Sequence, residues 1–219
     1  MRPLTETRPK PLIEVAGKPL IEHVIGALPR AIDEIIIVVG YRGAMIRKHL
    51  GSRHDNRHIR YVEQERQEGT AAALAAARPL LSGRFLLMCA DDIHGAPALA
   101  QACNYPLAIL AAHHVEPQKF GVIEVSTESL LQSFEEKPDI PKSNLVSTGA
   151  MVLDERVFSY PAPRHENGEH YLTSQVAALA HDVPVRVVTQ SMWIPVGYPD
   201  DIKEAERQLH LERYTQHNP

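Results

Sequence analysis

Short apolar runs alternate with segments of helical spacing in the first half of the chain. The run Ile35–Val39 is apolar and β-branched, and 85–90 is also continuously apolar, which predicts two buried strands. Further strands are expected at 59–62 and 107–112, and helices at 14–28, 44–50, 71–81 and 97–102. This alternation predicts an α/β fold whose mixed, mostly parallel sheet carries helices on both faces.

The second half of the chain has a different pattern. Its apolar positions predict a hairpin-type pair of strands at 121–125 and 130–134, further strands at 146–153 and 185–189, and helices at 171–180 and 199–211. We find no internal repeat, low-complexity tract or linker. We therefore expect a single domain over 1–219, made of two halves that meet near residue 112.

Composition narrows the class of partner. Of the 219 residues 44 % are hydrophobic, which is ample for a core, and the net charge is -4 with no long run of one sign. This charge argues against binding of a nucleic acid or an anionic membrane through bulk electrostatic attraction. No apolar stretch approaches the roughly 20 residues that span a bilayer, and the N-terminus does not resemble a secretory signal.

Cysteine and histidine usage points to a reduced compartment without a zinc site. Cys89 and Cys103 are the two cysteines and have no CxxC spacing, so we expect free thiols and a cytoplasmic location. The 12 histidines are scattered without cysteine partners or an HExxH frame. Solvated histidines are the better interpretation.

Residues 1–12 combine prolines with cations. Pro3, Pro9 and Pro11 alternate with Arg2, Arg8 and Lys10 in this segment. A strand or helix interior does not accommodate this density of proline, since each proline removes a backbone donor. We therefore expect a fixed, cation-rich loop of the kind that can hold a phosphate chain.

Three other positions admit both a functional and a structural interpretation. Asp91 or Asp92 follows a predicted strand, where a carboxylate either holds Mg²⁺ or caps the next helix. The pair Gly69-Thr70 either lets a flat ring approach the backbone or starts a helix capped by Thr70. The sequence Glu136-Lys137 before a proline is, taken alone, typical of a solvated turn.

Several segments resemble, in order, the motifs of the nucleotidyltransferases that make nucleotide sugars. The matching segments are Arg2 to Thr5, Pro9 to Leu12, Tyr61 to Gln64, Gly69 to Ala71, Ala90 to Ile93, Pro117 to Val122, Glu136 to Pro138, Ser147 to Gly149, Glu169 to Thr173 and Trp193 to Asp200. The resemblance implies a Rossmann-like α/β fold of the nucleotide-diphospho-sugar transferase type. It also implies transfer of a nucleotidyl group from a nucleoside triphosphate to a sugar 1-phosphate.

The resemblance also implies roles for individual residues. Lys10, with Arg2 nearby, is expected to bind the triphosphate, and Asp91 to bind Mg²⁺. Gln64, Gly69 and Thr70 are expected to bind the base. Lys137 is expected to bind the acceptor phosphate, and the sugar is expected to contact Gly121, Glu136, Gly149 and Glu169. About 1–112 would then be the nucleotide-binding half and about 113–219 the sugar-phosphate half. Acceptor-side strands and the last helix are expected to offer an interface for a homo-oligomer.

Two departures from the family pattern stand out. The glycine-rich turn that precedes Arg2 in the family is absent, so we expect the natural chain to extend upstream and the strands flanking the missing one to lack a partner. Pro195 stands where the family has a second metal-binding aspartate, and Asp200 and Asp201 are expected to start the last helix instead.

These departures leave two hypotheses open. The chain is either an active nucleotidyltransferase or a catalytically impaired relative that binds a nucleotide or nucleotide sugar as a sensor or partner subunit. A dinucleotide-dependent oxidoreductase is poorly supported, because no GxGxxG follows a predicted strand.

Overall fold

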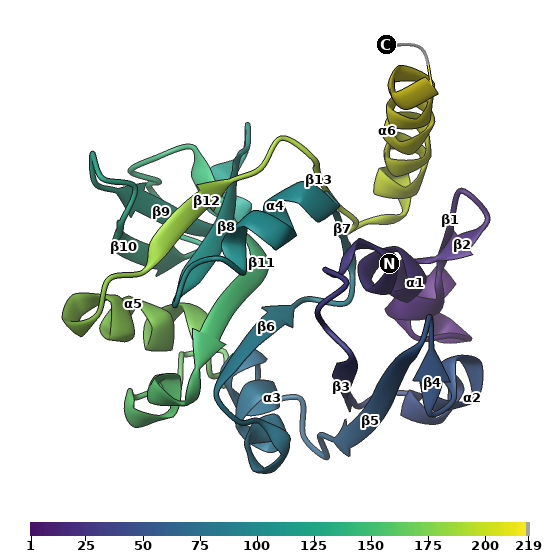
Figure 1. Ribbon diagram of the computed structural model, residues 1–219, viewed down its shortest axis with the longest axis horizontal. Coiled ribbons are helices and arrows are strands. Elements are labelled where there is room, and N and C mark those ends of the chain that lie inside the picture. Colours follow the sequence, from purple (N-terminus) through teal and green to yellow (C-terminus); the bar gives the residue numbers. More distant parts are fainter. Residues whose placement is uncertain (218–219) are drawn as a thin grey trace.

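The computed structural model describes residues 1–217, and for residues 212–217 it describes the helical backbone only. Its largest sheet has six strands in the order β10-β9-β11-β8-β12, with β6 pairing to β11 beside this row (Figure 1). The bounds of these strands are β6 Arg84–Met88, β8 Ala108–His113, β9 Gly121–Val125, β10 Leu131–Glu136, β11 Leu145–Asp154 and β12 Arg186–Thr189.

Three smaller sheets accompany the large one. The order β3-β5-β4 forms a three-stranded sheet, and β1 with β2 and β7 with β13 form two-stranded ones. Their bounds are β1 Glu14–Val15, β2 Lys18–Pro19, β3 Glu34–Val39, β4 Arg53–His54, β5 Arg57–Glu63, β7 Asp92–His94 and β13 Trp193–Pro195. The α-helices are α1 Leu20–Ala27, α2 Gly43–Leu50, α3 Thr70–Ala77, α4 Ala96–Ala102, α5 Leu172–Asp182 and α6 Pro199–His217.

Both faces of the large sheet are covered, which explains the continuous apolar runs. Ile109 of β8 packs in the cluster that contains Val176 of α5, whereas its neighbour Leu110 packs in the cluster that contains Leu99 of α4. Successive residues of a strand point to opposite faces, so a strand buried on both faces needs apolar side chains at every position. The expected helices on both faces are confirmed.

Strand direction corrects one part of the predicted fold. The sheets are mixed, as expected, but only β3–β5 and β8–β12 are parallel pairs among the described strands. The long strand β11 pairs antiparallel with β6, β8 and β9, and this makes antiparallel ladders the majority. The expectation of a mostly parallel sheet is therefore wrong in detail, since strand direction depends on connections that local apolar patterns do not report.

The elements predicted from apolar patterns are present with small shifts of their ends, with one clear exception. The expected helix 14–28 begins only at Leu20, because Ala16 and Gly17 form a two-residue turn between β1 and β2. Both residues have positive φ, at 51° and 75°, which is the geometry of a tight hairpin turn. Pro19 then precedes the first residue of α1.

Within the described residues, β3 and β6 each pair along one edge only. β3 pairs with β5, and β6 pairs with β11. The apolar side chains of β6 are all half-buried rather than buried. Figure 1 shows β6 on the side of the six-stranded sheet that faces the three-stranded sheet. Each of these two strands therefore has one edge without a ladder among the described residues.

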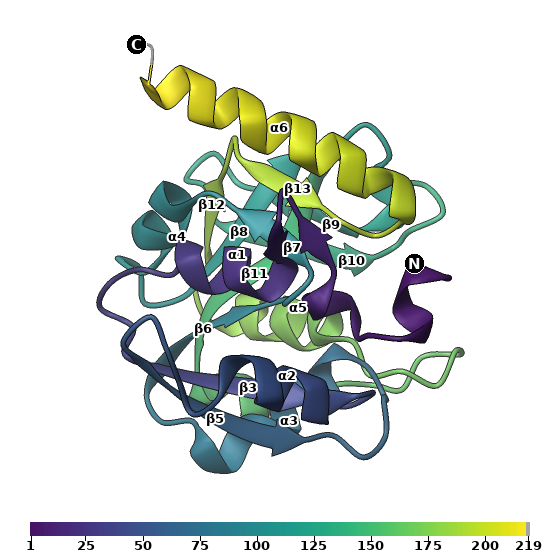
Figure 2. The ribbon, with the colours of Figure 1, turned by 90° about the vertical axis from the view of Figure 1, so that its right-hand side faces the viewer.

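The C-terminal helix α6 lies over β13 and the hairpin β1–β2 (Figure 2). Ala205 of α6 is fully buried in a cluster with Val15 and Ile194. This packing connects the N-terminal segment to the strand that carries Pro195. No helix in the described part of the chain is both long and apolar enough to cross a lipid bilayer.

Candidate active site

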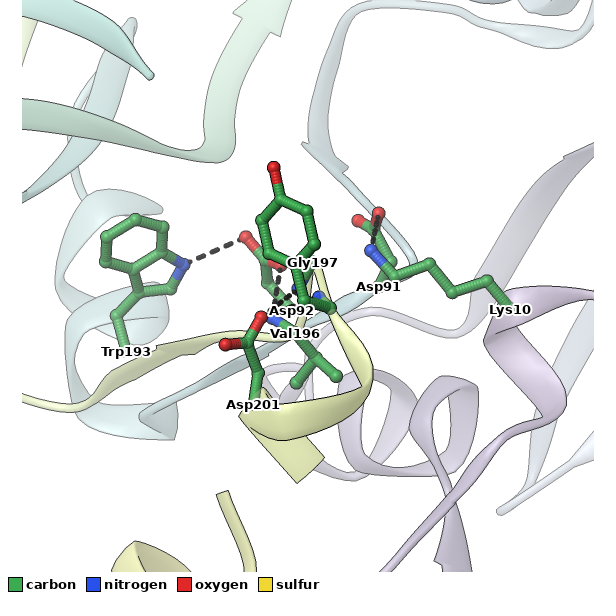
Figure 3. Close-up of polar contacts among 8 residues, drawn as sticks. Lys10, Asp91, Asp92, Trp193, Val196, Gly197 and Asp201 are labelled. Atoms are coloured by element: carbon green, nitrogen blue, oxygen red, sulfur yellow. Dashed lines mark hydrogen bonds and ion pairs between the residues drawn. The ribbon is translucent and has the colours of Figure 1, made fainter. Parts of the chain in front are cut away.

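A lysine–aspartate pair joins the N-terminal loop to the end of β6. Lys10 follows Pro9 and begins the 3-10 turn Lys10–Leu12, and Asp91 lies in the turn between β6 and β7. The Nζ atom of Lys10 lies 2.7 Å from Oδ2 of Asp91 (Figure 3). Their side chains are 23 % and 38 % exposed, so the pair is open to a ligand from solvent. Two residues predicted to act on the triphosphate and its metal are thus in contact.

Asp92 has a structural role that differs from that of its neighbour. Its Oδ2 accepts a hydrogen bond from Nε1 of Trp193 at 3.1 Å, and its Oδ1 accepts one from the backbone N–H of Val196 at 3.3 Å. Burial raises the pKa of Asp92 to about 7, with a smaller contribution from the charge of Asp91. The residue before α4 is Gly95, which has no capping side chain, so neither aspartate caps that helix.

Pro195 lies directly opposite Asp92 in the ladder between β7 and β13. A proline side chain offers no ligand atom, so the side chain at this position adds nothing to a cation site. Asp201 accepts hydrogen bonds from the backbone N–H groups of Gly197 and Tyr198, at 2.8 and 2.7 Å. As expected, Asp201 serves the start of α6 and does not replace the missing carboxylate.

Cys89 links the end of β6 to the predicted sugar site. The backbone N–H of Cys89 donates to the carbonyl of Gly149, and a Cβ atom on Gly149 would lie 2.8 Å from the Cys89 sulfur. Burial raises the pKa of the thiol, and the carboxylates of Asp91, Asp92 and Glu136 raise it further. Asp91, Gly149 and Glu136 therefore all lie near the thiol of Cys89.

Gly121 and Glu136 are paired across β9 and β10. A Cβ atom on Gly121 would lie 2.6 Å from the ring of Phe134 and 3.5 Å from Oε2 of Glu136. The glycine therefore avoids a clash with the ring beside the carboxylate, and its role in leaving room for a sugar stays a prediction. Oε2 of Glu136 accepts a short hydrogen bond from the hydroxyl of Thr173, a residue whose importance sequence reasoning missed.

Lys137 directly follows Glu136 and has a positive φ of 43°. Its Nζ lies 3.9 Å from Oε1 of Glu136, and its side chain is 58 % exposed. The backbone N–H of Lys137 donates to the carbonyl of Phe120, which holds it beside Gly121. Lys137 thus stands at the rim of the predicted sugar site with its ammonium group open to a phosphate.

Gln64, Gly69 and Thr70 lie in the segment that joins β5 to α3. The backbone N–H of Gln64 donates to Val39, whereas its side-chain Nε2 is buried without a partner among the described residues. Thr70 is the first residue of α3, and no side chain caps that helix. The alternative in which Thr70 caps α3 is therefore wrong, because its hydroxyl accepts from the backbone N–H of Leu172 at 2.9 Å.

Glu169 makes side-chain hydrogen bonds within the loop before α5, whereas the side chain of Arg2 makes none to another described residue. Glu169 is half-buried in the loop before α5, where Nδ2 of Asn167 donates to its Oε2 at 3.2 Å. A hydrogen bond to Glu169 raises the pKa of Tyr171. Arg2 is exposed, and no hydrogen bond or ion pair connects its side chain to another described residue. The structure therefore does not join Arg2 to the Lys10–Asp91 pair.

The donor set around Asp91 fits a cation that keeps most of its coordination sites for other ligands. No group of three or more His, Cys, Asp or Glu side chains gathers as potential ligands in the part of the chain that the structure describes. Asp91 supplies one carboxylate, while the oxygens of Asp92 already accept hydrogen bonds. Mg²⁺ commonly binds through one or two carboxylates together with waters and substrate phosphates.

A mixed α/β fold with a lysine–aspartate pair at the end of β6 and a glycine opposite a glutamate across β9 and β10 agrees with the class of nucleotide-handling protein that the sequence resembles. The family model described as nucleotidyl transferase matches residues 1–212. The chain belongs to this nucleotidyl transferase family, whose members generally use a divalent metal ion.

Relatives with curated names agree with this assignment. The chain is 32 % identical over 212 residues to the "Bifunctional protein GlmU" of Methanocaldococcus jannaschii, which covers 95 % of this chain and 51 % of that protein. It is 29 % identical to the "UTP--glucose-1-phosphate uridylyltransferase AglF" of Haloferax volcanii, over 97 % of this chain and 92 % of that protein. The chain thus spans about half the length of the GlmU relatives that it matches.

Solved structures support the fold. A Bacillus anthracis protein described as a "Putative Glucose-1-Phosphate Thymidylyltransferase" in complex with sucrose superposes with a TM-score of 0.85 at 24 % identity, covering 95 % of this chain and 89 % of that chain. A UDP-glucose pyrophosphorylase complexed with UDP-glucose superposes with a TM-score of 0.83 at 19 % identity, covering 97 % and 94 %. The predicted family and the nucleotide-diphospho-sugar transferase type of fold are confirmed.

Proposed function

We propose that this chain transfers a nucleotidyl group from a nucleoside triphosphate to a sugar 1-phosphate. In this reaction a phosphate oxygen of the sugar 1-phosphate forms a bond to the α-phosphorus, the bond from the α-phosphorus to the bridging oxygen breaks, and pyrophosphate leaves. The observation that carries the proposal is the contact between Lys10 and Asp91 at the end of β6. A cation and a carboxylate held together at this point suit a bound triphosphate with its metal.

The residues of the nucleotide-binding half, about 1–112, bind and orient the triphosphate in this proposal. Lys10 neutralises charge on the phosphates, and Arg2 is kept as a second candidate on the same loop. Asp91 would hold Mg²⁺, which when bound neutralises phosphate charge. Gln64 reads the edge of the base, which the unpartnered Nε2 of its buried amide supports. The backbone of Gly69 and Thr70 lines the base, while the hydroxyl of Thr70 is engaged by the N–H of Leu172.

The residues of the sugar-phosphate half, about 113–219, hold the acceptor. Lys137 binds the acceptor phosphate, and its exposed ammonium group at the rim of the site supports this role. Glu136 and Glu169 accept hydrogen bonds from sugar hydroxyls, and Gly121 and Gly149 leave room for the ring. The reaction needs no protein nucleophile, so the protein contributes mainly positioning and charge neutralisation.

A second candidate function is a catalytically impaired binder of a nucleotide or nucleotide sugar. Pro195 favours it, because it faces Asp92 where a second metal-binding carboxylate is expected. A cytoplasmic location and a homo-oligomeric state belong to the proposal as further predictions. The location rests on the free thiols Cys89 and Cys103, and protein thiols stay reduced in that compartment.

One experiment distinguishes the two candidates. Pyrophosphate release is measured with UTP or dTTP plus glucose 1-phosphate and with GTP plus mannose 1-phosphate, each with Mg²⁺, while calorimetry measures binding of every ligand separately. Pyrophosphate release that needs both substrates supports the transferase. Binding without release for every pair supports the impaired binder. Neither binding nor release overturns both.

A further inference from the structure

The predicted base-binding segment is joined to the predicted sugar-binding segment by direct backbone contacts. The N–H of Ala71 donates to the carbonyl of His170 at 2.9 Å, and the N–H of His170 donates to the carbonyl of Glu68 at 2.7 Å. The hydroxyl of Thr70 accepts from the N–H of Leu172 at 2.9 Å. Three hydrogen bonds thus connect two segments that lie far apart in the sequence.

Gly69 makes this contact close. It has a positive φ of 98°, and a Cβ atom there would lie 2.5 Å from the carbonyl oxygen and 2.8 Å from the nitrogen of His170. No side chain fits between the two backbones, since real Cβ contacts are longer than this. Contact with the sugar-side loop therefore requires a glycine at this position, whether or not a base is bound.

Thr70 completes the N-terminus of α5 from the other half of the chain. Leu172 is the first residue of that helix, so its N–H has no acceptor within the helix. Tyr171 precedes it and provides no capping side chain. The hydroxyl oxygen of Thr70 supplies the missing acceptor. The first turn of α5 is thereby held to the base-binding segment.

The same first turn of α5 holds a sugar-side carboxylate. Thr173 is 6 % exposed, and its hydroxyl donates to Oε2 of Glu136. The side chain of Glu136 is 19 % exposed, so few other conformations that reach solvent are open to it. A continuous path of contacts thus runs from Thr70 through Leu172 and Thr173 to Glu136.

We propose that Thr70 is a positioning residue for the sugar 1-phosphate and couples binding of the two substrates. The inference rests on the proposed function, because it concerns the same site. A nucleotide that orders the segment 68–71 also fixes the start of α5 and the carboxylate of Glu136. The nucleotide therefore raises the affinity for the sugar 1-phosphate, and by reciprocity the sugar 1-phosphate raises the affinity for the nucleotide.

The test compares T70V, which keeps the shape but removes the acceptor, with T70S, which keeps the acceptor. T189V is the matched control, because Thr189 is exposed at the end of β12. Calorimetry measures the affinity for glucose 1-phosphate and mannose 1-phosphate, alone and with the nucleotide, and the affinity for the nucleotide alone. Steady-state kinetics with the active pair gives the KM of each substrate.

We expect T70V to raise the Kd and KM of the sugar 1-phosphate roughly tenfold in the presence of nucleotide, as one lost buried acceptor implies. The Kd of the nucleotide alone should change less than about twofold. T70S should restore the affinity for the sugar 1-phosphate, and T189V should match the unaltered protein. Equal weakening of both ligands by T70V, or no weakening of either, would overturn the proposal.

The two proposals fail in different ways. If the unaltered protein binds a sugar 1-phosphate without releasing pyrophosphate, and T70V still weakens that binding selectively, the transferase proposal fails and the positioning role stands. If pyrophosphate is released but T70V leaves the KM of the sugar 1-phosphate unchanged, the positioning role fails alone. Absence of binding for every sugar 1-phosphate overturns both.

Discussion

The Nζ atom of Lys10 lies 2.7 Å from Oδ2 of Asp91. Lys10 precedes β1, whereas Asp91 lies between β6 and β7, 81 residues further along the chain. The contact is partly exposed, so it contributes little to folding, because ion pairs open to solvent are worth about 0–1 kcal/mol. The role that we propose for the pair is therefore in ligand binding, and it predicts little effect on stability. This distinction can be measured.

K10M should lower kcat/KM for pyrophosphate release roughly 100-fold, as expected when one charge that stabilises the transition state is removed. The free energy of unfolding should change by less than about 1 kcal/mol. K119M is the control, because Nζ of Lys119 also lies 2.7 Å from a carboxylate, that of Glu116, in an exposed pair. Equal activity of K10M and K119M would contradict the assigned role.

Gly149 provides a test of close packing at the end of β6. Its φ is +74° and a Cβ atom would lie 2.8 Å from the sulfur of Cys89. G149A should destabilise the protein by about 2–4 kcal/mol, because it adds a left-handed alanine and a clash in a packed site. Denaturant unfolding measures the change.

Gly83 separates the two causes of this destabilisation. Its φ is +59°, but a Cβ atom there would meet nothing within 4 Å. G83A should therefore show the backbone cost alone, about 1–2 kcal/mol. The double variant C89A/G149A should recover the part due to the sulfur. A G149A variant no less stable than G83A would rule out the clash with Cys89.

The sequence predicted most helices and strands because their apolar residues are local signals. The β-branched run that became β3 and the apolar run that became β6 each report burial within a few residues. The short strands β7 and β13 were missed, since each has three residues and is defined by pairing with a segment far along the chain. The hairpin β1–β2 was missed although Ala16-Gly17 carried a turn signal.

Much of the candidate site was predictable only through the family resemblance. The triphosphate was assigned to Lys10 and Mg²⁺ to Asp91 on that ground, and the structure brings the two residues into contact. The roles of Thr173 and Trp193 were not predictable, because each acts through one long-range hydrogen bond to a carboxylate. A hydroxyl or indole in a sequence gives no sign of which distant acceptor it will find.

Asp92 and Trp193 allow a spectroscopic prediction, because Trp193 is the single tryptophan of the chain. Its Nε1 donates to Oδ2 of Asp92 at 3.1 Å. D92N turns an ionisable acceptor into an amide that cannot serve both Trp193 and Val196 equally well. We expect a shifted emission maximum and a loss of about 1–3 kcal/mol in the free energy of unfolding.

D91N is the matched control for this variant. It makes the same chemical change one residue away, but Asp91 bonds to Lys10 and not to Trp193. Its emission spectrum should equal that of the unaltered protein, while its pyrophosphate release should fall. Identical spectra for D92N and the unaltered protein would show that the bond to Trp193 does not persist in solution.

His94 makes folding stability depend on acid pH. Its ring is buried, Nδ1 accepts from Nε2 of Gln190 at 3.2 Å, and Nε2 has no partner among the described residues. Burial lowers the pKa of His94 from 6.5 to about 4, although Gln190 and the charge of Asp91 oppose this. The unfolded chain therefore binds a proton between these pH values that the folded chain does not.

His94 should thus contribute fully to the free energy of unfolding above pH 6.5, and this contribution should fall by up to about 3 kcal/mol as the pH decreases toward 4. The raised pKa of Asp92 acts in the opposite direction over a similar range, so the comparison with a variant at position 94 isolates the contribution of His94. H94Q removes the titrating group, so its stability should fall less steeply over this range. H113N is the control, because His113 is exposed and its Nδ1 hydrogen-bonds to Asn144. Denaturant unfolding at several pH values measures the slopes, and parallel curves for H94Q and the unaltered protein would exclude His94 as the cause.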